Sequence, residues 1–89
     1  MTAHQNPPAE FLLGAAPRGF IGTIVALKPG TPGSPAAELA GQLVEMGFTE
    51  GARVEILHQG AVARDPIAVR VDNITVALRR REAMAVVVI

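Results

Sequence analysis

The chain contains no cysteine, tryptophan or tyrosine, and three phenylalanines are its only aromatic residues. Without cysteine there is no disulfide framework, no thiolate nucleophile and no sulfur-ligated zinc site. Without aromatic platforms the chain has little on which nucleic-acid bases could stack. Eight basic and eight acidic residues cancel, so we expect no long-range attraction to nucleic acid or to an acidic membrane surface. Any electrostatic recognition must therefore be local.

Long apolar runs are missing as well. None approaches the roughly 20 residues that cross a bilayer, and the first residues, with His4 and Pro7-Pro8, do not resemble a signal peptide. We therefore expect a cytoplasmic protein that does not insert into a membrane. A length of 89 residues, with 49% hydrophobic side chains, predicts one small domain. Residues 1–10 are expected to form a flexible tail, and residues 11–89 the folded domain.

The β-branched and alternating segments of the sequence predict five short strands. Val54 and Ile56 alternate with charged residues, and Ile67, Val69 and Val71 share one face. Asp72-Asn73 separates two such runs and predicts a tight hairpin turn, because both residue types tolerate positive φ. The five predicted strands cover residues 20–27, 53–60, 66–71, 74–78 and 85–89.

One amphipathic helix is predicted between the first and second strands. Residues 28–35 are rich in Pro and Gly and predict an exposed loop, at the end of which Ser34 can cap a helix that starts at Pro35. The apolar stripe of that helix runs to Met46, and Gly47 suits its end. Five strands with a single helix exclude a doubly wound sheet. They predict a mainly β fold, a small bent antiparallel barrel, because closure hides strand edges.

Residues for chemistry are sparse. The only histidines are His4 and His58, and neither lies near Ser34 in sequence, so no nucleophile, base and acid come together. We predict that the protein is not an enzyme.

His58 and Glu55 could supply a nitrogen and an oxygen to a divalent transition metal, with Met46 or Glu45 to complete the site, within one chain or between two. A lone histidine at a strand end is more often a plain surface residue. No cofactor is certain, and any metal affinity should be weak.

Arg79-Arg80-Arg81, with Arg70 on an earlier strand, is the one dense basic feature. A triple Arg can clamp phosphates. In a neutral chain without stacking aromatics we favour instead a solvated rim that docks an acidic partner surface. Val86, Val87 and Val88 present apolar atoms on both faces of the last predicted strand, so an exposed face or edge there could pair two barrels, which leaves self-association into a homo-oligomer as a further alternative.

These segments together resemble the FeoA family of ferrous iron transport proteins. Residues 43–57, LVEMGFTEGARVEIL, are similar to the family's helix–turn–strand, and residues 65–88, DPIAVRVDNITVALRRREAMAVVV, to its closing strands. Upstream, Leu12-Leu13, Gly19, Gly22 and Ile24 resemble the opening strand, so the likeness covers about residues 12–88.

The resemblance implies an SH3-like barrel that acts as a cytosolic accessory of ferrous iron uptake. It implies docking on the cytoplasmic, GTP-binding part of a FeoB-type membrane transporter. Contact residues would be exposed ones beside the core pattern, namely Arg70, Arg79, Arg80, Arg81 and Glu45. A rival interpretation is a metal-sensing module, because the same barrel resembles the C-terminal domain of iron-dependent repressors, whose helix-turn-helix domain has no counterpart in this sequence.

Overall fold

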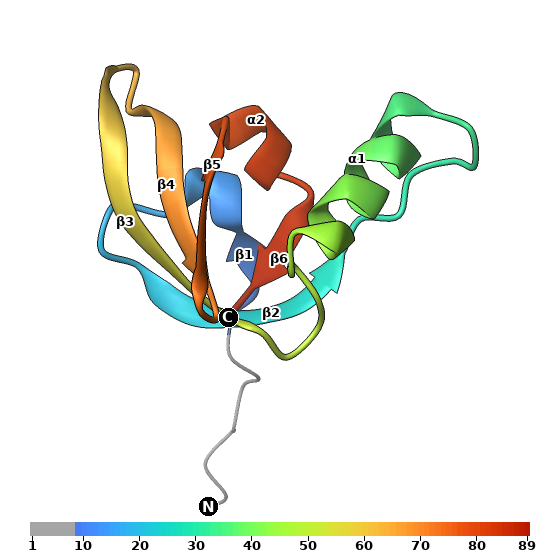
Figure 1. The fold of residues 1–89 in the computed structure, drawn as a ribbon, viewed down its shortest axis with the longest axis horizontal. Helices are drawn as coiled ribbons and strands as arrows, with labels where there is room; N and C mark the ends of the chain where they lie inside the picture. The colour runs from blue at the N-terminus through green and yellow to red at the C-terminus, as the bar shows by residue number, and fades with distance from the viewer. Residues whose placement is uncertain (1–8) are drawn as a thin grey trace, which may run out of the picture.

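A computed structural model describes residues 9–89 and shows six strands in one curled antiparallel sheet (Figure 1). Residues 1–8, most of the predicted tail, lie outside the described residues. The strands follow one another across the sheet in the order β1-β6-β2-β3-β4-β5. The elements are β1 (Phe11–Leu12), the 3-10 turn η1 (Leu13–Ala15), β2 (Ile21–Leu27), α1 (Pro35–Glu45), β3 (Arg53–Val62), β4 (Asp65–Val71), β5 (Ile74–Leu78), α2 (Arg80–Ala83) and β6 (Val86–Val88).

The aliphatic alternations point to a common interior, as the sequence predicts. Val54 and Ile56 of β3 are fully buried, and their charged neighbours Arg53 and Glu55 are not. Burial of these side chains is the main stabilising term for a chain of this size. The core is formed by Leu13, Ala16, Ile24, Leu43, Phe48, Ala52, Val54, Ile56, Ile67, Val69, Val71, Leu78, Ala83, Val86 and Val88.

The helix α1 forms where the sequence places it. The Ser34 hydroxyl oxygen accepts a hydrogen bond from the Ala37 N–H at 3.2 Å, which caps the first turn. Gly47, with φ 104°, ends the helix in a conformation that favours glycine, and Phe48 then turns into the core. Only Leu43 of α1 is fully buried. The helix lies beside β6 and the end of β2 (Figure 1).

Three details of the expected strand layout change. Phe11–Leu12 forms an additional strand that pairs with β6, and residues 80–83, expected as a charged turn, form α2. The last strand is interior, paired with β1 on one side and β2 on the other. Self-association through it as an exposed edge is therefore wrong.

The hairpin between β3 and β4 is longer and tighter than expected. The sequence predicts that the chain leaves the strand at Gly60, but β3 continues to Val62, and Ala63-Arg64 alone makes the turn into Asp65. In the turn after β4 it is Asp72, with φ 51°, that takes the positive φ.

Candidate partner-binding surface

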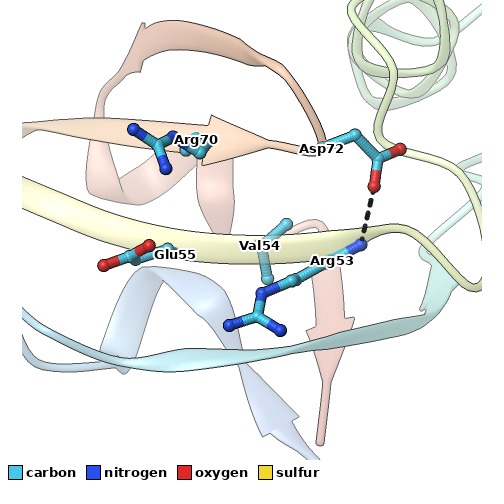
Figure 2. A pocket seen from close by; sticks show the side chains of 5 residues that line it. All are labelled: Arg53, Val54, Glu55, Arg70 and Asp72. Atoms are coloured by element: carbon cyan, nitrogen blue, oxygen red, sulfur yellow. Dashed lines mark hydrogen bonds between the residues drawn. The ribbon is translucent and has the colours of Figure 1, made fainter.

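The outer face of β3 and β4 carries a shallow pocket of about 270 Å³, lined by charged side chains (Figure 2). Buried Val54, Val69 and Val71 alternate with residues that point outward, because successive strand residues face opposite sides of a sheet. The pocket is lined by Arg53, Val54, Glu55, Arg70 and Asp72. Its rim therefore carries both signs of charge side by side.

Two hydrogen bonds fix one end of this pocket. The Arg53 N–H donates to Asp72 Oδ1 at 3.2 Å, and the Asp72 N–H donates to the Arg53 carbonyl oxygen at 2.9 Å. The second bond extends the β3–β4 ladder by one residue into the turn. Asp72 therefore both shapes the turn and holds the start of β3.

Glu55 and Arg70 face each other across the ladder. They are directly opposite in register, an arrangement in which opposite charges attract. In Figure 2 both charged groups extend along their strands away from Asp72, whereas the Arg53 guanidinium turns toward β2. Two guanidinium groups and two carboxylates thus offer donors and acceptors to a partner's polar side chains.

The two metal-ligand candidates lie on this same outer face. Glu55 is opposite Arg70 and His58 is opposite Ala68, and those two β4 residues share a face. The register shift between Ile56 and His58 makes this possible, because a regular strand would place positions 55 and 58 on opposite faces. No group of three or more His, Asp or Glu side chains in residues 9–89 is placed to hold a metal. Glu45 lies apart, exposed at the end of α1.

The three arginines of the run 79–81 differ in their exposure and in their contacts. Arg79 and Arg81 are exposed at α2. This helix follows the end of β5 that lies farthest from the turn at Asp72. Arg80 is half-buried, and its guanidinium donates to protein groups throughout. Its bonds run from Nε to the Arg64 carbonyl (2.8 Å), from Nη1 to the Gly14 (3.1 Å) and Ala16 (2.7 Å) carbonyls, and from Nη2 to Gln59 Oε1 (3.0 Å).

The expectation that Arg80 is an exposed contact residue is therefore corrected. Arg80 joins α2 to η1 and to the β3–β4 hairpin. This role could not be predicted from the residue types, because three of the four acceptors of Arg80 are backbone carbonyls. The pocket itself was also missed, since it depends on the β3–β4 register.

Comparison with known proteins places this arrangement in a family. The model of the FeoA domain matches residues 11–89. The chain belongs to the FeoA family. That family is one of ferrous iron transport accessory proteins and is not a known enzyme family. No curated protein sequence matches the chain.

Solved FeoA structures share the fold. FeoA of Stenotrophomonas maltophilia, solved in complex with zinc and described as a prokaryotic SH3 domain protein, is 28% identical with a TM-score of 0.74, over 89% of this chain and 89% of that one. Iron(II) transport protein A of Clostridium thermocellum is 30% identical with a TM-score of 0.72, over 89% of this chain and 45% of that one. The SH3-like barrel predicted from the sequence is confirmed.

A second group of similar structures consists of metal-dependent repressors. A manganese-dependent transcriptional repressor is 25% identical with a TM-score of 0.75, over 96% of this chain and 43% of that one. The FeoA domain thus corresponds to less than half of that regulator. In residues 9–89 of the FeoA chain no helix is both long and apolar enough to span a bilayer.

Proposed function

We propose that this chain is a non-enzymatic cytosolic accessory of ferrous iron uptake, which docks on the cytoplasmic GTP-binding part of a FeoB-type transporter and modulates transport. Membership of the FeoA family over residues 11–89 is the observation that carries the proposal. The zinc-complexed relative is itself described as a candidate activating factor of bacterial ferrous iron transport. The role of the chain is binding, with no covalent step.

Docking uses exposed charged side chains on three parts of the surface. Arg70, opposite Glu55, contributes from the pocket on the sheet, while Arg79 and Arg81 contribute from the end that carries α2. Exposed guanidinium groups form forked hydrogen bonds with partner carboxylates. Glu45, at the end of α1, provides an acidic contact on a third element. Arg80 contributes indirectly, by holding α2 in place.

The test measures binding of the full chain to the purified GTP-binding domain of the transporter from the same organism, by calorimetry at two salt concentrations. Arg79→Glu with Arg81→Glu should weaken binding about tenfold or more, and Arg70→Glu should do so separately. The matched control is Arg18→Glu with Lys28→Glu, which changes the net charge equally at exposed sites on other loops. Equal losses for both double variants would show a general charge effect and would contradict this surface.

Weak binding of a divalent transition metal at His58 and Glu55 is a second candidate function. The register shift in β3 brings both side chains to one face, and imidazole with carboxylate is a donor pair that transition metals accept. The likeness to a zinc-complexed FeoA and to manganese-dependent repressors supports it. Two donors leave most coordination positions to water or to another chain, so affinity should be low. A metal-sensing module related to repressor C-terminal domains is the corresponding alternative function.

A further inference from the structure

The strand β5 ends the sheet on one side and leaves a long uncharged edge. The opposite end of the sheet is β1, which has only two residues, whereas β5 runs from Ile74 to Leu78 with the sequence ITVAL. Edge strands in soluble proteins are usually shortened, charged or interrupted by proline, because an open edge pairs with other chains. The β5 strand shows none of these features.

The free hydrogen-bonding groups of this edge can be assigned from the register. The two-residue turn makes Val71 and Ile74 a hydrogen-bonded pair, and such pairs alternate along an antiparallel ladder. The N–H and C=O groups of Thr75 and Ala77 therefore point away from β4. Among residues 9–89, no backbone hydrogen bond outside the regular helices and strands involves either residue. Both side chains are exposed, so the edge is open to a second strand.

A second copy of β5 fits this edge in one symmetric register. If the two strands run antiparallel about a two-fold axis at Val76, they overlap over their whole length, and Thr75 of one copy pairs with Ala77 of the other. The N–H and C=O groups that point outward then bond reciprocally. On the inner side, Ile74 of one copy meets Leu78 of the other. Ile74 is 57% exposed in the single chain, so this contact covers apolar surface.

The opposite charges at the two ends of β5 also favour a second copy of this strand that runs antiparallel. Asp72 precedes the strand and Arg79 follows it, and both are exposed; Oδ1 of Asp72 accepts from the Arg53 N–H of its own chain, so Oδ2 is the oxygen that would meet a second copy. An antiparallel second copy brings the acidic end of each strand to the basic end of the other, twice by symmetry. A parallel copy would bring like charges together at both ends.

From these observations we infer that β5 is a homodimerisation strand, through which two copies of this chain join their sheets edge to edge. The interface is small and has only a few hydrogen bonds at its centre, so the dimer exchanges with monomer. It lies on the sheet edge, sharing Asp72 with the pocket lining and Arg79 with the docking residues, and the inference itself does not rest on the docking proposed above.

The first test is sedimentation equilibrium of the full chain. The weight-average mass should rise from one toward two chains between about 10 µM and 1 mM. Ala77→Pro removes a donor that points away from β4 and should weaken association about tenfold or more while the β4–β5 ladder is kept. Binding of the transporter domain, measured separately, should be unchanged in this variant, which distinguishes failure of this inference from failure of the docking proposal.

The second test does not depend on how well the proline variant folds. The chain contains no cysteine, so Val76→Cys introduces a unique thiol on the two-fold axis, and mild oxidation should trap a disulfide-linked dimer. Glu50→Cys, at an exposed turn that precedes β3, is the matched control and should cross-link several-fold more slowly. Equal cross-linking rates, or a monomeric wild-type mass at about 1 mM, would overturn the inference. A monomeric chain whose Ala77→Pro variant loses the transporter domain would assign the edge to a foreign strand and would also overturn it.

Discussion

Arg80 donates from Nη1 to the carbonyl oxygen of Ala16 at 2.7 Å, across 64 positions of the sequence. The same nitrogen also reaches the Gly14 carbonyl, while Nε reaches the carbonyl of Arg64. One side chain therefore joins the beginning of the domain, the β3–β4 hairpin and α2. Its guanidinium group is the side-chain donor to the carbonyl groups of Gly14, Ala16 and Arg64.

Arg80→Ala should destabilise the fold by about 2–4 kcal/mol, because carbonyl groups that are partly shielded from water lose their charged donor. The backbone N–H of Arg80 still donates to Asp65 Oδ1 in this variant, so α2 keeps one of its anchors. Urea denaturation followed by circular dichroism measures the change. Arg81→Ala, at an exposed position on the same helix, should change stability by no more than about 0.5 kcal/mol. Equal effects of the two substitutions would contradict the role assigned to Arg80.

The turn at Ala63-Arg64 predicts a stabilising double substitution. Both residues have positive φ, 56° and 58°, the conformation in which asparagine and glycine are favoured in two-residue hairpins. A left-handed L-residue costs about 1–2 kcal/mol, so Ala63→Asn with Arg64→Gly should raise the free energy of unfolding by roughly 1 kcal/mol after the entropic cost of glycine. The Arg64 carbonyl remains available to Arg80. A thermal melt of the double variant that shows no increase would contradict the strain at this turn.

The turn at Ala63-Arg64 is one part of the fold that could not be predicted from the sequence. The alternations at 54–56 and 67–71 predicted inward faces correctly, because a strand with one buried face must alternate. Asp72-Asn73 was recognised because its residue types favour turns, but Ala63-Arg64 was not, because neither residue favours positive φ. The additional strand β1 was missed because two residues carry no periodicity, and only pairing with β6 defines it.

The candidate site was predicted less completely than the fold, for a related reason. Sequence alone suggested His58 and Glu55 as a metal-donor pair and Arg70 as a separate contact residue, and only the β3–β4 register brings all three to one face. In a regular strand Glu55 and His58, three residues apart, would face opposite sides of the sheet. A register shift reverses that rule, and no local feature of the sequence indicates where such a shift falls.

Two glycines should respond in opposite directions to alanine. A Cβ at Gly41 meets no heavy atom within 4 Å, so Gly41→Ala in α1 should stabilise the protein by about 0.5–1 kcal/mol through helix propensity. A Cβ at Gly60 would collide with the backbone carbonyl of Asp65 across the β3–β4 hairpin. Gly60→Ala should therefore destabilise by about 1–3 kcal/mol. Denaturant titration of both variants side by side checks the pair, and a neutral Gly60→Ala would show that the two strands approach less closely.

Metal binding at the sheet face should depend on both His58 and Glu55. Zn(II), Mn(II) and Fe(II), the last under anaerobic conditions, are titrated into the ¹⁵N-labelled chain while the His58 ring and the neighbouring amides of β3 are followed by NMR. We expect shifts with a midpoint in the high-micromolar to millimolar range, because the chain supplies only two donors.

His58→Ala should abolish the shifts, and Glu55→Gln should weaken binding several-fold by removing the charged donor. Glu50→Gln serves as the control for lost negative charge. An unshifted His58 at millimolar metal, or equal losses in Glu50→Gln and Glu55→Gln, would leave the face to partner binding alone.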